Sequence, residues 1–438
     1  MNDKSTLGRR SFMKAAGAAA GASTLAACVP GGGETGSGGS GGSGSGSGPL
    51  HLTYWAWVDD PTSTVVQDLA AQFNEERTSL QVDVEIMPAE AVYNRVIASI
   101  NAGDPPDATA IHVNNVADIA AMGALQELDE YWDSFPEADD ITPAAVLGSR
   151  LGKEDNPLYT MPWNALVTYL YYRTDWFAEA GIEPPETTDD FLAAARAITD
   201  PDAGRYGYGL RGSSHGHIHY FVWLATLGGF DAVRDEQGNP VFDRAENLQY
   251  TDWFLDLARE HQVTPPTASG DGFEQIMNNM KAGVSGMMLH HIKSAAELTQ
   301  SIGAENLAAI PVPASPSGNR FTEFGPNMNA VYADGQDPEA AFEWVSFLAS
   351  RESQITFSQQ DGSLPIIESA WDDEHLQENP FAQVSFEAMA DAYLMPFTDR
   401  PGYSRLAEQT WPQSTQPALS GGITTEEFAT GLADEVRE

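Results

Sequence analysis

The sequence has little cysteine and little positive charge. Cys28 is the only cysteine among 438 residues, so the chain has no disulfide framework. Lysine and arginine together number 22 against 63 acidic residues, and the formal net charge is −41. This balance excludes a nucleic-acid partner, which needs a basic surface, and it argues against binding to anionic lipid head groups. Only three lysines follow residue 27: Lys153, Lys281 and Lys293.

The apolar run near the N-terminus is too short to span a membrane well. Small and apolar residues extend from Ala15 to Ala27, whereas a spanning helix needs about 20 apolar residues. The pair Arg9-Arg10 precedes this run, and Cys28 follows it directly. This order predicts a twin-arginine export signal over residues 1–27. The position of Cys28 after Leu-Ala-Ala resembles the cleavage box of a lipoprotein, in which this cysteine is lipidated.

A Gly/Ser-rich tract follows Cys28 and continues to Gly48. Gly/Ser chains behave as flexible coils, so residues 28–49 are predicted to be a lipidated cysteine with a flexible tether. Two acyl chains hold a protein stably at a membrane, whereas one chain does so only marginally. We therefore expect a diacyl anchor that keeps the following domain at the extracellular face of the cell membrane.

The rest of the chain has the composition of a folded protein. Hydrophobic residues make up 42% of the sequence, which includes ten tryptophans, whereas disordered chains are poor in aromatic residues. The acidity and the scarcity of lysine resemble proteins of salt-loving archaea, in whose surroundings salt screens the repulsion between carboxylates.

Strand and helix patterns alternate after the tether. About 390 residues are more than one hydrophobic core usually organises, so two lobes are expected. Strand patterns at 50–57, 82–86 and 108–113 are separated by helix patterns that contain Val66, Leu69 and Phe73 and then residues 93–103. They predict a largely parallel sheet covered by helices on both faces, with a ligand beyond the carboxyl ends of the strands.

A second series of elements begins at Met161. We expect a strand over 165–172, a helix over 174–180 that ends at Gly181, and a helix capped by the segment 187–190. A short strand over 206–210 and a buried helix over 219–227 follow.

Several motifs in this order resemble one known family. They are Asn101–Asp107, Tyr159–Arg173, Lys281–Met288, Ile310–Pro313, Pro338–Leu348, Gly362–Pro365 and Leu419–Phe428. In these segments the chain resembles the extracellular solute-binding proteins of sugar-type ABC importers (family 1, similar to maltose-binding protein). The resemblance covers nearly all of residues 50–438.

The resemblance implies an α/β fold with two lobes, of the type II periplasmic-binding-protein kind. Each lobe is a mostly parallel sheet flanked by helices, and crossing strands form the hinge. Residues 50–160 plus 311–335 are assigned to lobe 1, and residues 161–310 plus 336–438 to lobe 2. The implied function is the capture of a sugar or oligosaccharide by hinge closure and its delivery to an ABC permease. A monomer without enzymatic activity and without a cofactor is expected.

The candidate ligand-binding residues lie just after strands or at the expected lobe crossings. A sugar ring has apolar faces, which aromatic side chains cover, and a rim of hydroxyls, which polar side chains must satisfy because an unpartnered buried hydroxyl costs free energy. Tyr403 suits either role. The pair His290-His291 departs from the family pattern after its strand. The candidate stacking residues are Trp55, Trp57, Trp163 and Trp223, and the candidate hydrogen-bonding residues are Asp59, Asn114, Asn164, Asn327 and Arg400.

Three other patterns keep different functions open. The segment Gly212–Gly216 matches the G-x-S-x-G pattern of α/β-hydrolases, with Ser214 as nucleophile and with Asp271 and His290 as its partners. The alternating His215, His217 and His219 favour a receptor for zinc or copper. Paired carboxylates suit glycoside hydrolysis, and they occur at Asp59-Asp60, Asp139-Asp140, Asp189-Asp190 and Asp372-Asp373.

Overall fold

The computed structural model describes residues 48–58 and 63–437, and all structural statements below refer to these residues. Arg9, Arg10, Cys28 and Asp59 lie outside the described residues. The predictions of an export signal, a lipid anchor and a ligand contact at these positions therefore stay predictions.

The first part of the chain alternates strands and helices as predicted. Its elements are β1 (Leu50–Ala56), α1 (Val65–Glu76), β2 (Leu80–Ile86), α2 (Ala89–Ala102), β3 (Ala108–His112), α3 (Val113–Ala121), α4 (Asp129–Trp132) and α5 (Pro143–Ser149).

A long strand opens the middle part, which is mainly helical. Its elements are β4 (Thr160–Arg173), α6 (Thr174–Ala180), α7 (Thr188–Ala197), β5 (Tyr206–Tyr208), α8 (His217–Gly228), α9 (Leu248–Arg259), α10 (Phe273–Lys281), β6 (Ser285–His291), α11 (Ala295–Ile302) and β7 (Leu307–Ile310).

A second long strand opens the last part. Its elements are β8 (Thr322–Val331), α12 (Pro338–Ala349), α13 (Arg351–Asp361), β9 (Leu364–Pro365), α14 (Glu374–Gln377), α15 (Pro380–Ala388), β10 (Ala392–Tyr393), α16 (Tyr403–Arg405), α17 (Trp411–Leu419) and α18 (Thr425–Val436). A π-helical turn at Leu406–Thr410 joins α16 to α17.

Local sequence signals fix several helix ends. Thr187 and Asp190 form a capping box at the start of α7, in which each side chain accepts a hydrogen bond from the other residue's backbone N–H. Gly181 ends α6 at a φ of 67°, which a residue with a side chain adopts only with strain. The predicted bounds of α6 are confirmed for this reason.

The strands form one sheet in the order β2-β1-β3-β8-β4-β6-β5. β1 pairs in parallel with β2 and β3, and β5 pairs in parallel with β6. β8 and β4 lie between these two parallel groups and pair antiparallel with each other and with their outer neighbours β3 and β6. The sheet is therefore parallel at both ends and antiparallel in the middle.

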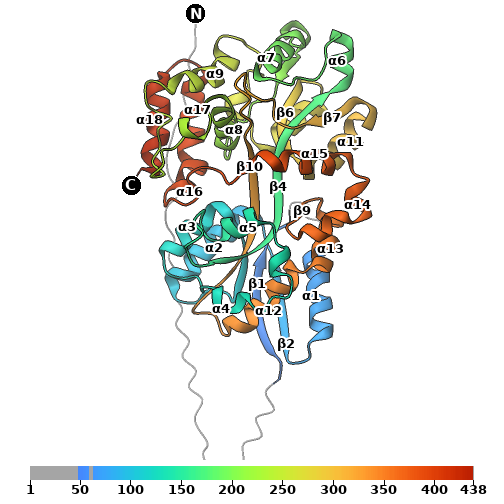
Figure 1. Ribbon diagram of the computed structural model, residues 1–438, viewed down its shortest axis with the longest axis vertical. Coiled ribbons are helices and arrows are strands. Elements are labelled where there is room, and N and C mark those ends of the chain that lie inside the picture. Colours follow the sequence, from blue (N-terminus) through green and yellow to red (C-terminus); the bar gives the residue numbers. More distant parts are fainter. Residues whose placement is uncertain (1–47, 59–62, 438) are drawn as a thin grey trace, which may run out of the picture. The chain divides into compact units, whose positions relative to one another are not determined.

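β4 and β8 are the two strands that connect the halves of the molecule, and Figure 1 shows them running through its middle. β4 pairs with β8 through Thr160–Val167, with a register shift between Pro162 and Asn164, and with β6 through Thr168–Tyr172. It begins five residues earlier than the predicted strand, because its first residues cross between the halves and are paired there. β10 adds a short parallel pairing to the start of β8.

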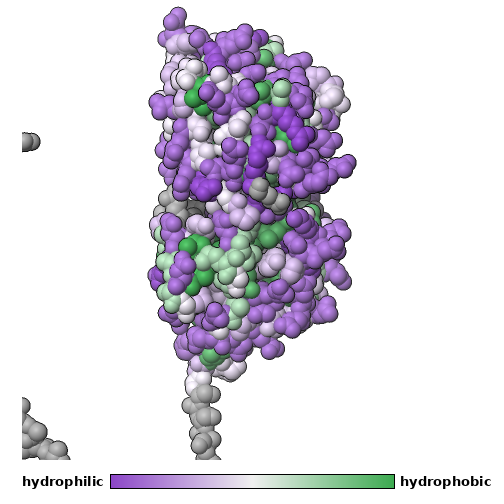
Figure 2. Space-filling model, turned by 90° about the vertical axis from the view of Figure 1, so that its left-hand side faces the viewer, coloured by the Kyte–Doolittle hydropathy of each residue, from purple (hydrophilic) through white to green (hydrophobic). Residues whose placement is uncertain are grey.

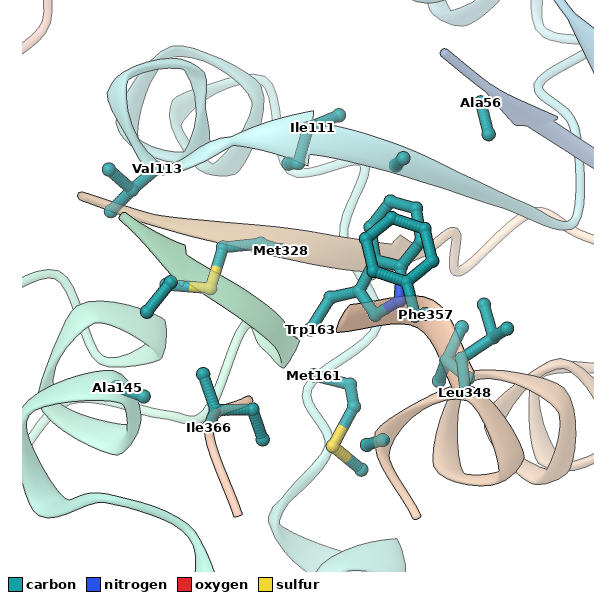
Figure 3. Packing of buried hydrophobic residues seen from close by; sticks show 14 of the residues in the cluster. Ala56, Ile111, Val113, Ala145, Met161, Trp163, Met328, Leu348, Phe357 and Ile366 are labelled. Atoms are coloured by element: carbon teal, nitrogen blue, oxygen red, sulfur yellow. The ribbon is translucent and has the colours of Figure 1, made fainter. Parts of the chain in front are cut away.

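Buried apolar residues form two clusters along this sheet. The larger cluster contains Trp163, whose ring lies 4.5 Å from that of Phe357 between centroids (Figure 3). α12 packs into the same cluster, where Trp344 contacts Phe73 of α1. The second cluster is built around α8, all of whose residues from His217 to Thr226 are buried. The predicted buried helix is therefore confirmed.

Hydrophilic residues cover most of the face shown in Figure 2, in keeping with the acidic composition. Within the described ranges, no helix is both long enough and apolar enough to cross a membrane. The described residues form one compact unit, and the predicted lobe boundaries at residues 160, 311 and 335 stay predictions.

Candidate functional site

Polar side chains gather where β1, β3, β4 and β8 meet. The ring of Trp57, just after β1, lies 4.4 Å from that of His112, the last residue of β3, between centroids. His112 donates from Nδ1 to Oδ1 of Asn327 at 2.9 Å, and Nδ2 of Asn327 donates to Oδ1 of Asn164 at 2.9 Å. The carboxyl ends of β1 and β3 therefore meet the crossing strands, as parallel-sheet geometry predicts.

A second group comes from the other half of the chain and surrounds Arg211. Arg211 lies three residues after β5, and the loop that carries it leads into α8. A side chain at Gly216 would place its Cβ 2.0 Å from the backbone oxygen of Arg211, so only glycine permits this close turn before α8. The guanidinium carbon of Arg211 lies 5.6 Å from the ring centroid of Phe273.

Histidines of α8 and of the preceding loop contact the C-terminal segment. Nε2 of His217 lies 2.9 Å from the hydroxyl of Tyr403. The hydroxyl of Ser214 donates to Oε2 of Glu408 at 2.6 Å, and Nε2 of His215 lies 3.1 Å from Oε1 of the same carboxylate. Sequence positions 214–217 and 403–408 therefore form one wall.

The pair His290-His291 at the end of β6 forms another wall. The two imidazoles lie 4.7 Å apart between centroids, and the ring of Phe273 lies 4.4 Å from His290. Nδ1 of His290 lies 2.5 Å from the hydroxyl of Ser294. The pair His290-His291, which departs from the family pattern, therefore has defined side-chain contacts in the structure.

Together these residues form what we call the central polar site. It consists of Trp57, His112, Asn164, Arg211, His215, His217, His219, Phe273, His290, His291, Glu323, Asn327, Tyr403 and Glu408. Six of the nine histidines of the chain lie in it. Electrostatic interactions link the two groups, since His215 interacts with His112 and Arg211 with both Glu323 and Glu408.

Burial holds the imidazoles in their neutral form. Desolvation lowers the pKa of His217 and of His291 to about 3, and it lowers the pKa of His219 and His290 well below the usual value. A positive charge nearby, on Arg211, acts in the same direction on all four histidines.

Burial also shifts the pKa of the charged groups of the site. Desolvation lowers the pKa of Arg211 to about 10, against the opposing effect of Glu323 and Glu408. It raises the pKa of Glu323, although Thr168 donates a hydrogen bond to that carboxylate at 2.7 Å. Arg211 stays protonated at neutral pH, so the site contains one cation faced by two carboxyl groups.

Several buried nitrogens of the site have no hydrogen-bond partner among the described residues. They are Nε of Arg211, Nδ1 of His217, Nδ1 of His219, Nε2 of His290 and Nδ1 of His291. Buried polar groups are almost always hydrogen-bonded in folded proteins. Such a concentration in one place makes the central polar site a candidate position for a hydrogen-bonding solute.

Contacts between α3 and the segment before α17 lie beside the site. Nδ2 of Asn115 donates to the hydroxyl of Ser404 at 3.3 Å, and that hydroxyl donates to the backbone oxygen of Asn114 at 3.2 Å. The N–H of Gly402 donates to Oδ1 of Asp118 at 3.4 Å. These bonds join the first and last parts of the chain.

The structure brings together five of the residues predicted to bind a ligand: Trp57, Asn164, Asn327, Tyr403 and, at the edge, Asn114. Of the other five, Asp59 lies outside the described residues, and Trp55, Trp163, Trp223 and Arg400 lie elsewhere. A ligand contact at any of the ten stays a prediction. Trp55 is covered by the guanidinium of Arg95 at 4.0 Å.

Three more predicted residues serve packing or local bonding. Trp163 is 1% exposed within the larger cluster, and Trp223 is fully buried in the second one, where its Nε1 donates to Tyr208 at 3.2 Å. Arg400 donates to the backbone oxygen of Gly238 at 3.1 Å.

Sequence reasoning missed Arg211, Phe273, Glu323, Glu408 and His112 as members of the site. A usable signal existed for two of them, because His112 lies near the end of a predicted strand and Arg211 follows one. Glu323 and Glu408 carry no local signal among so many acidic residues.

The hydrolase interpretation is wrong in its geometry. Ser214 bonds to Glu408 and not to His290, whose Nδ1 contacts Ser294 instead. The carboxylate of Asp271 accepts hydrogen bonds from Thr267 at 3.0 Å and from Asn279 at 2.8 Å. The three groups therefore do not form the relay that a serine nucleophile needs.

The metal-binding interpretation is also not supported. His217 and His219 are two residues apart on α8, so their side chains leave the helix on different sides. Among the described residues, no three His, Cys, Asp or Glu side chains are grouped so that they could hold a metal ion.

Three of the four carboxylate pairs contain a residue with a structural partner, and the fourth pair, Asp59-Asp60, lies outside the described residues. Oδ1 of Asp140 accepts from the backbone of Ser369 at 3.2 Å, Asp190 caps α7, and Asp373 accepts from the backbone of His375 at 3.2 Å. Asp190 and Asp373 therefore act at helix starts, and Asp140 bonds to a distant segment of the chain.

The sequence matches one known protein family over most of its length. The model of the bacterial extracellular solute-binding protein family matches residues 56–355. The chain belongs to this family. Its members are non-enzymatic receptors of transport systems and act outside the cell or in the periplasm.

Solved structures of solute-binding proteins share the two-lobe fold. An ABC transporter solute-binding protein of Thermotoga lettingae, bound with α-D-tagatose, superposes with a TM-score of 0.76 at 22% identity over 88% of this chain and 98% of its own. The maltose-bound MalE3 of T. maritima gives a TM-score of 0.75 at 21% identity over 88% and 98%. The mannitol-binding protein of Pseudomonas aeruginosa is 22% identical over 74% of this chain and 76% of its own.

Proposed function

We propose that this solute-binding protein captures a sugar or an oligosaccharide in the central polar site and delivers it to the permease of an ABC importer. The observation that carries the proposal is the set of buried, unpartnered nitrogens on Arg211, on α8 and at the end of β6. Similar proteins that bind tagatose, maltose and mannitol support the choice of a polyhydroxylated solute.

The chemistry of the site suits hydroxyl groups. Each neutral imidazole has one nitrogen that donates and one that accepts, and each sugar hydroxyl also does both. Arg211 offers donors only, whereas Glu323 and Asn327 offer acceptors. The rings of Trp57 and Phe273 supply apolar surface for a sugar face.

The charges favour an uncharged solute. The single cation, Arg211, interacts with both Glu323 and Glu408, and burial keeps the surrounding histidines neutral. A phosphate or carboxylate on the solute would add a further negative charge to a site whose cation already has two carboxyl groups near it.

Capture proceeds by closure of the lobes about β4 and β8. A solute drives closure only through contacts that it makes in the closed form. The hydrogen bonds of Asn115 and Asp118 to the segment 402–404 join α3 to the C-terminal part of the chain. In this proposal they contribute to the stability of the closed form.

The N-terminal part gives the receptor its place in the cell. Residues 1–27 act as the twin-arginine signal, and Cys28 carries the lipid anchor at the outer face of the membrane. The receptor works as a monomer, performs no chemistry on the sugar and needs no cofactor.

A binding screen tests this function. Thermal unfolding and tryptophan fluorescence of residues 48–438 in high salt are measured against sugars, polyols, sugar phosphates and divalent metals. A ligand at 100 times its dissociation constant stabilises the native state by about 2.7 kcal/mol. Stabilisation by an uncharged sugar is expected. Stabilisation by zinc or copper alone, or by none of these solutes, contradicts the proposal.

A further inference from the structure

A groove with acidic walls lies between the end of α1, α4 with the segment after it, and α12. Its volume is about 800 Å³. Figure 1 shows α4 and α12 in the lower half of the molecule, whereas α8 and β6, which carry histidines of the central polar site, lie in the upper half. We call this feature the acidic groove. Its charged lining residues are Arg77, Glu130, Glu137, Asp337, Glu339 and Glu343.

Among the described residues that line the groove, Arg77 is the only cation. Its guanidinium carbon lies 4.0 Å from the ring centroid of Phe73 and 5.5 Å from that of Phe347. Nε of Arg77 lies 2.6 Å from Oε1 of Glu343, and Nη1 lies 3.1 Å from Oε2 of Glu76. An aromatic ring beneath a guanidinium and a carboxylate beside it are favourable surroundings for arginine. One part of the groove is therefore already occupied by a cation of the chain itself.

The neighbouring part of the groove has the same components without a cation. Glu339 lies one turn before Glu343 on α12, so the two carboxylates leave the same face of that helix. The ring of Tyr131, which is partly exposed, lies 5.5 Å from that of Phe342 between centroids, and Glu130 precedes Tyr131 on α4. In the described part of the chain, neither Glu130 nor Glu339 has an ion-pair partner.

The negative charges of this part of the groove act together on Tyr131. Partial burial raises the pKa of the Tyr131 hydroxyl, and the charges of Glu130, Glu339 and Asp337 raise it further. The same charges attract a cation to the ring. Oγ of Ser346, another lining group, is buried without a hydrogen-bond partner among the described residues, so it offers an acceptor to a ligand rich in N–H donors.

We propose that the acidic groove binds an arginine side chain that a partner protein presents on an exposed segment. The guanidinium stacks on the ring of Tyr131 and donates to the carboxylates of Glu130 and Glu339. Arg77 uses its own part of the groove in the same way. Arginine suits this place because its flat guanidinium stacks on aromatic rings and its five N–H donors can reach two carboxylates.

The size and the apolar lining of the groove favour a protein segment over a small organic cation. A cavity of this volume holds a drug-sized molecule, so it has room for an arginine together with its neighbours in a peptide. Pro136, Ala340 and Phe347 supply apolar surface for those neighbours. The interaction is independent of the proposed sugar capture, because the two sites share no residue.

Titration of a dye-labelled, end-blocked peptide Gly-Leu-Arg-Leu-Gly with the full chain, followed by fluorescence anisotropy, tests the proposal. The measurement is made in 1 M KCl, where a screening length of about 3 Å removes the long-range attraction between any cation and this acidic protein. The reference is the same peptide with citrulline in place of arginine, which keeps the shape and removes the charge. The arginine peptide is expected to bind about tenfold or more tightly than the citrulline peptide.

Paired variants locate the binding in the groove. Glu130→Gln with Glu339→Gln should weaken binding of the arginine peptide about tenfold or more. Glu236→Gln with Glu246→Gln removes two exposed carboxylates outside the groove and should leave the affinity unchanged. Tyr131→Phe keeps the aromatic ring and should keep the affinity, whereas Tyr131→Leu keeps only an apolar side chain and should lower it.

Three results would overturn the proposal. The first is equal affinity of the wild type for the arginine and citrulline peptides. The second is an equal effect of the groove pair and the control pair of substitutions, which would show that only the total charge matters. The third is equal affinity for the pentapeptide and for free acetyl-arginine amide, which would assign the groove to a small guanidinium compound. None of these results bears on sugar capture, so the two proposals fail separately.

Discussion

Nε2 of His217 lies 2.9 Å from the hydroxyl of Tyr403, although 186 residues separate the two in the sequence. Both side chains are fully buried, and the bond joins α8 to the C-terminal segment inside the central polar site. Removing the hydroxyl leaves one buried nitrogen without a partner. We therefore expect Tyr403→Phe to lower the free energy of unfolding by about 1–3 kcal/mol.

Urea unfolding of the ligand-free protein in high salt measures this effect. Tyr393→Phe is the matched control, because it removes the hydroxyl of a largely exposed tyrosine. Equal unfolding free energies for the two variants would show that the His217–Tyr403 bond contributes nothing.

The buried histidines predict that stability falls in mild acid. The pKa of His217 and of His291 is about 3 in the folded protein, because burial disfavours the charged imidazole, and it is about 6.5 in an unfolded chain. Between these values the unfolded chain binds more protons, so the free energy of unfolding decreases as the pH drops below about 6.5. Each histidine contributes about 1.4 kcal/mol per pH unit.

Thermal unfolding from about pH 7 to pH 5 measures this slope. His217→Gln should give a shallower slope than the wild type, because one titrating group is lost. Identical slopes for the two proteins would contradict the account.

The net charge of −41 predicts that salt stabilises the fold. The screening length falls from about 10 Å at 0.1 M salt to about 3 Å at 1 M, so repulsion between the many carboxylates weakens. The midpoint of thermal unfolding should rise steadily with KCl over this range. A midpoint that stays constant or falls would show that charge repulsion is not a main cost in folding.

The two tryptophans of the first strand region should differ in their effect on stability. Trp57 is 6% exposed and packs against His112, so Trp57→Ala leaves a cavity and should cost about 3–5 kcal/mol. Trp55 is half-buried under Arg95, and Trp55→Ala should cost about 1 kcal/mol. Chemical unfolding of both variants measures the two losses in the free energy of unfolding. Equal losses would contradict the prediction.

The sequence predicted the fold well where periodicity and capping act locally. α6 begins at Thr174 and ends before Gly181 as predicted, since the glycine stops the helix whatever surrounds it. The middle of the sheet was less predictable. The antiparallel pairing of β4 with β8 joins residues about 160 positions apart, and no local pattern specifies such a partner.

The site was predicted only in part, because only some of its residues lie at positions that local sequence patterns locate. Trp57 and Asn327 lie at strand ends or crossings, which the pattern of elements locates. Glu323 and Glu408 reach the site only through tertiary packing, and their sequence neighbourhoods look like those of many other acidic residues. Trp223 looked like a ligand-binding residue because of its type, but its ring is buried in the second cluster, against Phe191 and Trp253.

Calorimetric titration of the best sugar from the screen against Arg211→Met tests the central claim most directly. Arg211 is the only cation of the central polar site, and loss of a charged hydrogen-bond donor to the ligand should weaken binding by about tenfold or more. Arg244→Met, at an exposed ion pair, is the control and should bind like the wild type. Wild-type affinity in Arg211→Met would place the sugar outside the central polar site and contradict the account.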